Sequence, residues 1–189
     1  MKRLFLIGGL ATAFLLLVVA ASAQKANFGG TWTLDKAKSQ GLNPRMQGAD
    51  KVTWTVTQTD KTIQIDQKIE GGQPPAGGGG TGGGGGTGGG GGMGGGRGPG
   101  GPPTPAVYNL DGTETNMEMG QSKATLKATW SGSTLELGRK QIFSTPNGDV
   151  TSTNSRKLTL SGDGKVLTAV DHNESPRGTT DATYVFNKQ

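Results

Sequence analysis

The chain has 189 residues, a formal net charge of +5 and no cysteine, and 36 of its residues are glycine. Without cysteine it has neither disulfides nor thiolate metal ligands, so the core and the hydrogen-bonded strands alone must hold the fold. Lysine and arginine are scattered singly rather than gathered in a stripe, and we therefore expect no nucleic-acid partner despite the excess of basic residues.

The first 23 residues have the three-part pattern of a secretory signal peptide. A positively charged start precedes an apolar run over residues 4–20, and the small residues at 21–23 form a cleavage site. We expect an exported protein, periplasmic or extracellular, with no stable membrane insertion after cleavage. The alternative is an uncleaved anchor, because the run approaches the roughly 20 residues of a spanning helix.

The remaining residues, 24–189, are interpreted as a single domain whose dominant period is two. Apolar side chains alternate with threonine over residues 52–57, and a turn at Asp60 leads to isoleucines at 63, 65 and 69. Gln67 shares the face of these isoleucines. Such alternation is typical of strands with one buried face.

Residues 71–105 are almost entirely glycine, with some proline and threonine. Glycine loses the most backbone entropy on ordering and has no side chain to bury, so we expect a disordered loop. The few strands before it bury too little surface to fold alone, which argues against a linker between two domains. The loop lacks both the collagen period and the Gly-Lys-Ser/Thr ending of a phosphate-binding loop.

Strand and turn signals continue to the end of the chain. A short strand at 107–110 ends in the hairpin-favouring pair Asp111-Gly112. Only residues 34–38 suggest a helical turn. About eight to ten short strands predict an all-β fold, an antiparallel up-and-down meander that closes as a barrel. Its polar second face indicates a soluble barrel rather than an outer-membrane one. The later strands are expected near residues 124–130, 135–143, 150–160, 166–170 and 181–187.

The segment after the apolar run resembles the start of the lipocalins, whose first strand carries Gly-x-Trp, here Gly30-Thr31-Trp32. The continuation at 36–39 and the closing Tyr-x-Phe at 184–186 resemble a group of uncharacterised exported lipocalin-like proteins from soil bacteria. The resemblance implies a barrel whose cavity carries small hydrophobic molecules. It also implies a late-strand arginine packed across the tryptophan, for which Arg156 and Arg177 are the available counterparts.

The sequence offers little for catalysis, and we expect no enzyme activity, no cofactor and no metal. His172 is its single histidine, and no Gly-x-Ser-x-Gly motif presents a nucleophile. Asp171 and Glu174 are close in sequence to His172, but successive residues of a strand point to opposite faces.

The long strand at 150–160 carries a polar row, in which Ser152, Asn154 and Arg156 share a face with leucines. Facing inward, these groups need partners, because an unpaired buried polar group costs about 1–3 kcal/mol. Three interpretations stay open: ligand contact, a structural polar network, or solvent exposure after a bulge. The tryptophans are either core residues or lining of a cavity. The candidate ligand-binding residues are Trp32, Trp54, Gln67, Trp130, Ser152, Asn154 and Arg156.

The expected function is therefore that of an exported lipocalin-like binding protein for a small apolar or amphipathic molecule. Its cavity is expected to be lined by the tryptophans and the long strand. The alternative is a non-catalytic structural or interaction protein of the cell envelope, with a filled barrel.

Overall fold

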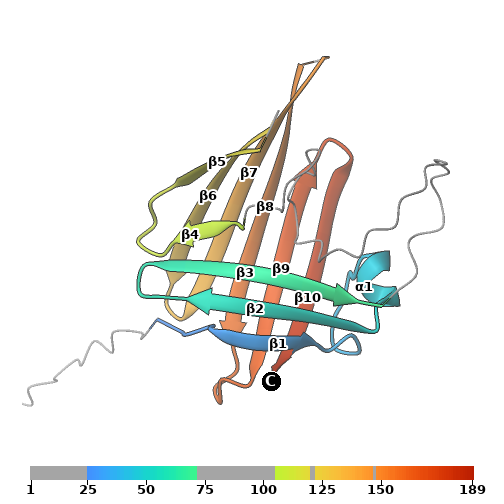
Figure 1. Ribbon diagram of the computed structural model, residues 1–189, viewed down its shortest axis with the longest axis vertical. Coiled ribbons are helices and arrows are strands. Elements are labelled where there is room, and N and C mark those ends of the chain that lie inside the picture. Colours follow the sequence, from blue (N-terminus) through green and yellow to red (C-terminus); the bar gives the residue numbers. More distant parts are fainter. Residues whose placement is uncertain (1–24, 72–104, 120–121, 147) are drawn as a thin grey trace, which may run out of the picture.

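The computed structural model describes residues 25–71, 105–119, 122–146 and 148–189 (Figure 1). The predicted signal peptide and residues 72–104 of the predicted glycine-rich loop lie outside this part of the chain. The described residues form ten strands and one short helix: β1 (Gly30–Leu34), α1 (Pro44–Gly48), β2 (Lys51–Gln58), β3 (Thr62–Glu70), β4 (Val107–Asn109), β5 (Thr115–Met119), β6 (Ser122–Ser131), β7 (Thr134–Thr145), β8 (Gly148–Leu160), β9 (Val166–Ser175) and β10 (Gly178–Lys188).

The strands build one antiparallel sheet in the order β4-β3-β2-β1-β10-β9-β8-β7-β6-β5. Neighbours in the sheet are neighbours in sequence, except that β1 pairs with β10 through Leu34 and Phe186. The sheet curls until its two edge strands approach each other, and the Asn109 side-chain amide donates to the Thr115 hydroxyl at 3.1 Å (Figure 1). The result is a nearly closed up-and-down barrel, which confirms the predicted all-β, lipocalin-like fold class.

The hairpin predicted at Asp111-Gly112 does not form, because the two strands on either side of this turn do not pair with each other. The chain turns there, with a positive φ of 87° at Gly112, but β4 pairs with β3 and β5 pairs with β6. The two strands that flank this turn are the two edges of the sheet. A favourable turn dipeptide is a local signal, and here the long-range pairings decide which strands form a ladder.

The helical turn predicted at 34–38 appears as one turn at residues 36–38, with a hydrogen bond from the Ser39 N–H to the Lys36 carbonyl oxygen at 3.4 Å. The short helix α1 was not predicted. The α1 helix begins after Asn43, whose side-chain oxygen accepts from the Met46 backbone N–H at 2.9 Å, and Pro44 occupies its first position. A helix of one turn is too short to show a 3.6-residue period. No helix in the described ranges is long and apolar enough to cross a membrane.

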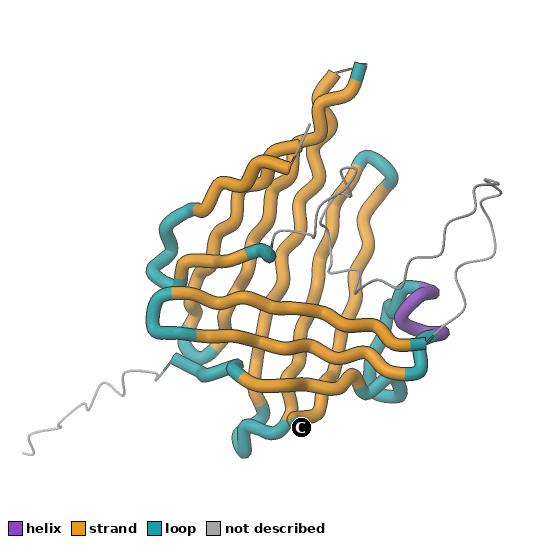
Figure 2. Tube along the Cα trace, in the orientation of Figure 1, coloured by secondary structure: helices purple, strands orange, loops and turns teal. Residues whose placement is uncertain are grey.

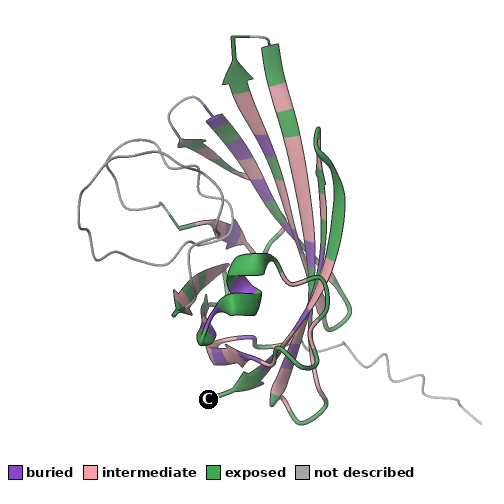
Figure 3. Cartoon of the chain, turned by 90° about the vertical axis from the view of Figure 1, so that its right-hand side faces the viewer, coloured by how far each residue is buried: buried purple, intermediate pink, exposed green. Residues whose placement is uncertain are grey.

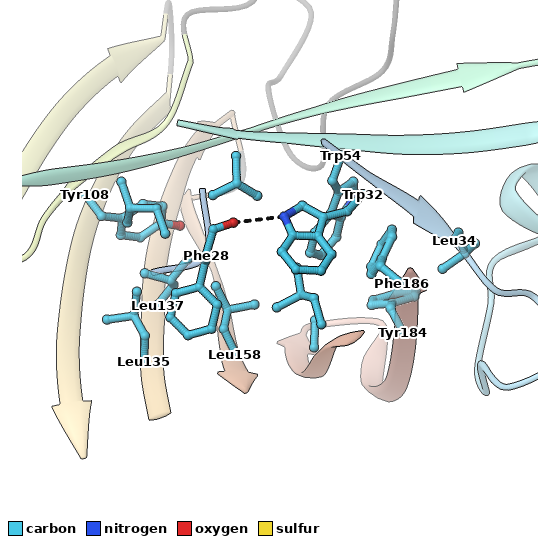
Figure 4. Close-up of a cluster of buried hydrophobic side chains, with 14 of the residues drawn as sticks. Phe28, Trp32, Leu34, Trp54, Tyr108, Leu135, Leu137, Leu158, Tyr184 and Phe186 are labelled. Carbon is cyan, nitrogen blue, oxygen red and sulfur yellow. Dashed lines mark hydrogen bonds between the residues drawn. The ribbon is translucent and has the colours of Figure 1, made fainter. Parts of the chain in front are cut away.

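One end of the barrel is filled with large apolar side chains (Figure 4). The Trp32 indole N–H donates to the Phe28 carbonyl oxygen at 2.8 Å, and the Trp54 and Phe186 rings lie 4.1 Å apart between centroids. Hydrophobic residues that are fully buried include Phe28, Trp32, Met46, Trp54, Ile63, Leu126, Leu135, Leu158, Leu167, Ala169 and Phe186. Except for the small Ala169, each of these side chains stabilises the fold by about 1.5–3 kcal/mol or more through burial. We call this region the packed half.

The opposite end of the barrel is less covered. There β7 and β8 extend beyond the neighbouring strands (Figure 2). Most residues on the upper parts of these two strands are intermediate or exposed, although Gln141 is buried (Figure 3). This end is the open half, and the candidate site lies in it.

Candidate functional site

Inward-facing side chains of β7, β8, β9 and β10 lie in successive rows across the sheet, in positions that the strand register fixes. The first row is apolar and belongs to the packed half: Leu135, Leu158, Ala169 and Tyr184. The second row introduces charge: Leu137, Arg156, Asp171 and Ala182. The third row is polar throughout: Arg139, Asn154, Asn173 and Thr180. Polarity therefore increases along the barrel axis from the packed half to the open half.

The charged row forms a floor between the two halves. Arg156 donates through Nε and Nη2 to the two carboxylate oxygens of Asp171, each at 2.6 Å. Its guanidinium lies 4.5 Å from the Trp54 ring centroid, and the Trp54 indole N–H donates to Gln67 Oε1 at 2.9 Å. Both charged residues are buried. The two-pronged geometry and the aromatic contact offset the cost of removing these charges from water.

Above this floor is a cavity of about 590 Å³. Its volume lies within the range of about 300–1,000 Å³ that is usual for small-molecule sites. The lining combines polar groups with the apolar surfaces of an aromatic residue on β7 and a tyrosine on β10. The described residues that line it are Gly41, Asn43, Pro44, Arg139, Gln141, Phe143, Ser152, Asn154, Asp171, Asn173, Thr180, Asp181, Ala182 and Tyr184.

The loop before α1 forms one rim of the cavity. Gln40 exchanges two backbone hydrogen bonds with Thr183 of β10, at 2.8 and 2.9 Å, which ties the loop to the barrel wall. Gly41 follows with a φ of 67°, and a Cβ atom at this position would collide with the Asp181 carbonyl oxygen. Only glycine lets the loop pass this close to β10. The rim is therefore held in place by the backbone.

Burial shapes the electrostatics of the site. Desolvation lowers the pKa of the Arg139 guanidinium, but an arginine remains charged at neutral pH. Desolvation also raises the pKa of the Tyr184 and Tyr108 hydroxyls above their usual value, so both stay neutral donors. Burial lowers the pKa of Arg156, but its bonds to Asp171 outweigh this effect and raise it overall. The floor is accordingly a fixed ion pair.

An exposed ionic cluster lies where the cavity rim meets the outer wall. Asp181 lines the cavity, and its carboxylate also lies 2.6 Å from His172 Nδ1. Glu174 approaches His172 Nε2 at 3.3 Å. Hydrogen bonds to Asp181 and then to Glu174 raise the pKa of the imidazole. As the strand alternation predicts, Asp171 points inward while His172 is exposed. In the described part of the chain, no group of three or more His, Asp or Glu residues could hold a metal ion.

The polar row predicted on the long strand faces the barrel interior, and its three members have different surroundings. Ser152 and Asn154 line the cavity. Their side chains also donate to backbone carbonyls of β9, Ser152 to Glu174 at 3.1 Å and Asn154 to His172 at 3.4 Å. Arg156 lies below them in the floor. The interpretation as a structural polar network therefore describes Arg156, whereas the first two residues remain open to a ligand.

The tryptophans do not line this cavity, which corrects the expected lining. Trp32 and Trp54 are fully buried in the packed half, where large rings fill the narrow end of the barrel, and Gln67 joins them as the acceptor of the Trp54 N–H. Trp130 is stacked on Phe28 at the base, with ring centroids 6.1 Å apart. It borders a separate hollow of about 390 Å³.

The packing that the lipocalin resemblance implied for Trp32 involves a different residue. The cation over its ring is the Lys188 ammonium of β10, 5.2 Å from the centroid. Arg156 packs on Trp54 instead. Arg177 lies in the exposed turn between β9 and β10.

Among the described residues that line the cavity, the sequence predicts only Ser152 and Asn154; the residues that it misses include Arg139, Gln141, Asp171, Asn173 and Tyr184. The alternation of inward-facing and outward-facing residues along each strand could have identified most of them. Arg139 and Gln141 continue the alternation of Leu135 and Leu137, and Asn173 continues that of the inward residues of β9. Extending each apolar face past its last leucine or alanine would have found them.

No protein-family model matches the chain, and no curated protein matches it in sequence. Among solved structures, the zebrafish ileal bile acid-binding protein in complex with cholic acid aligns with a TM-score of 0.43 and 15% sequence identity. The alignment covers 86% of this chain and 98% of the zebrafish chain.

Proposed function

We propose that this protein binds a small amphipathic molecule in the cavity of its open half. The observation that carries the proposal is a hollow of about 590 Å³ that lies on a packed core and a fixed ion pair. A cavity above such a floor has a preformed shape. Ligand binding therefore costs little conformational entropy of the protein. The alternative, a structural or interaction protein with a filled barrel, is supported by the packed half but not by the cavity of the open half.

The lining supports an amphipathic ligand rather than a purely apolar one. Phe143, Ala182 and Tyr184 offer apolar surface, whereas amide and hydroxyl groups cover much of the wall. A wholly apolar ligand would remove these polar groups from water without new hydrogen bonds, which costs about 1–3 kcal/mol for each group. A ligand with both kinds of surface avoids this cost.

Titration with the neutral, environment-sensitive dye Nile red tests the proposal. We expect a saturable fluorescence increase with one site per chain. Ala182→Trp places an indole in the cavity and should abolish the signal. Val170→Trp is the matched control, because Val170 of the adjacent strand is 45% exposed. This variant should bind the dye like the unmodified protein.

Circular dichroism and thermal unfolding must first establish that each variant is folded. Two outcomes would then contradict the proposal: no saturable binding to the folded protein, or equal binding by the Ala182→Trp and Val170→Trp variants.

We also propose that the protein acts outside the cytoplasm, on the strength of the signal-peptide pattern in residues 1–23. Mass spectrometry of the protein from fractionated bacteria should give a mature chain that begins at Gln24 in the periplasm or medium. A chain that retains residues 1–23 in the membrane fraction would instead support the anchor.

A further inference from the structure

The inference concerns the third row of the cavity wall, and it rests on the proposed function. Arg139, Asn154, Asn173 and Thr180 occupy directly opposed positions on four consecutive strands, and we call them the polar belt. All four line the cavity. A ligand that lies on the floor can therefore contact a continuous band of hydrogen-bonding side chains, one from each strand.

The polar belt presents both donors and acceptors. Arg139 Nη2 donates to Gln141 Oε1 at 2.8 Å, and the Asn154 amide donates to the His172 carbonyl oxygen at 3.4 Å. In the described residues, the Asn173 amide and the Thr180 hydroxyl make no side-chain hydrogen bond. An amide carries a donor group and an acceptor oxygen, and a hydroxyl can act as either. The belt thus suits a partner group that can both donate and accept.

Most ionic groups near the cavity are paired with one another. In the floor, Arg156 is paired with Asp171 at 2.6 Å, and on the outer face the Asp181 carboxylate lies 2.6 Å from His172. On the wall, Arg139 donates to Gln141 at 2.8 Å. A ligand carboxylate would bring only acceptors, and the amide oxygens of the belt would find no donor. A ligand ammonium would bring only donors and would meet the charge of Arg139. A charged group of either sign therefore leaves part of the belt unmatched.

We propose that the ligand is a neutral amphiphile that carries hydroxyl groups, and that these groups lie against the polar belt. A hydroxyl matches both functions of Asn173 and Thr180 and needs no countercharge. The apolar part of the ligand then contacts Phe143, Ala182 and Tyr184, which belong to the same cavity. The class comprises polyhydroxylated apolar molecules and alkyl glycosides, and it excludes simple fatty acids.

Three compounds with the same octyl chain separate these chemistries: octyl β-D-glucoside below its micellar concentration, octanoate, and octylammonium. Isothermal titration calorimetry on the full mature chain should give the tightest binding for the glucoside. In the double variant Asn173→Leu and Thr180→Val, the glucoside should bind about tenfold or more weakly, because two hydrogen-bonding partners are lost. The octanoate affinity should change little.

Two controls make the result specific to the belt. Thr179→Val changes the neighbouring exposed residue on the other face of β10 and should leave glucoside binding unchanged. Nile red must still bind the double variant, which shows that its cavity is intact.

The outcomes distinguish this inference from the proposed function. If the unmodified protein binds Nile red but prefers octanoate or octylammonium, the prediction of a hydroxylated ligand is wrong, but the cavity still binds a ligand. If the double variant keeps the full glucoside affinity, the belt is not the contact surface and the inference is overturned. If the unmodified protein binds none of these compounds and no Nile red, the proposed function fails, and the inference fails with it.

Discussion

Arg156 and Asp171 form a two-pronged ion pair, with both N–O distances at 2.6 Å, and the guanidinium of this pair rests 4.5 Å from the Trp54 ring centroid. The pair joins β8 to β9 directly across the sheet. It closes the packed half and supports the cavity above it. Because the pair is buried, its loss should lower the free energy of unfolding more than the loss of an exposed ion pair.

Breaking the pair from one side should destabilise the protein strongly. Asp171→Asn leaves Arg156 buried and charged without its carboxylate, so the free energy of unfolding should fall by about 3–5 kcal/mol. Replacing both partners by apolar residues, Arg156→Met with Asp171→Leu, should cost much less, because no buried charge is left behind. Urea unfolding followed by tryptophan fluorescence measures both changes.

The exposed pair Lys123–Glu118 supplies the control for this experiment. Its N–O distance is 3.9 Å and both side chains are about 80% exposed. Glu118→Gln should therefore change stability by less than about 0.5 kcal/mol. A loss of similar size at both sites would contradict the role assigned to burial.

The packed half should respond to truncation far more than the outer wall. Leu158 is fully buried, and Leu158→Ala should lower the free energy of unfolding by about 2–5 kcal/mol because it leaves a cavity among large side chains. Val170 is 45% exposed on the neighbouring strand, and Val170→Ala should stay within about 0.5 kcal/mol. Chemical denaturation of both variants gives the comparison, and similar losses would show that the core assignment is wrong.

The rim glycine offers a matched pair of substitutions. Gly41→Ala should destabilise the protein by more than about 1 kcal/mol, since its φ of 67° disfavours a side chain and the new Cβ would meet β10. Gly48 at the end of α1 has open space around it and no positive φ, so Gly48→Ala should leave stability unchanged or raise it slightly. Differential scanning calorimetry would report opposite or clearly unequal shifts of Tm. Equal shifts would argue against a fixed rim.

The single histidine should titrate above its ordinary pKa of about 6.5, because its ring contacts two carboxylates. Pairing favours the protonated ring, so this contribution to stability is complete below about pH 6.5 and is lost as pH rises through the raised pKa. NMR titration of the one imidazole resonance measures the value directly. Asp181→Asn should lower the pKa, because Asp181 is the larger cause of the shift. An unchanged pKa in this variant would rule out the contact.

The fold could be predicted largely from the sequence, because alternation is a local property that survives into the structure. The strand at 52–57, the long strand at 150–160 and the final strand all appear near their expected places. The pairing of β4 and β5 could not be predicted, since it depends on where a curled sheet leaves its edges. The α1 helix escaped because its single turn is set by the cap at Asn43 rather than by periodicity.

The site was only partly predictable. Ser152 and Asn154 were identified because the long strand places them on an apolar face. Asp171 gives no comparable signal, because its alternation with His172 shows only that the two side chains point to opposite faces, and not that its partner is Arg156. Pairing the two requires the register between β8 and β9, which no single strand contains. The tryptophans attracted attention by size, but large rings fill a narrow barrel end as readily as they line a cavity.

The succession of rows from Leu158 through Arg156 to Asn154 separates the part of the molecule that must be kept from the part that can be varied. Residues of the packed half contact one another, so a change there spreads through the core. Residues of the polar belt lie above the floor, and each faces the cavity from its own strand. Substitutions in the belt can therefore alter which molecule is held while leaving the framework intact. Such an arrangement makes the open half a natural starting point for designing new binding specificities on this barrel.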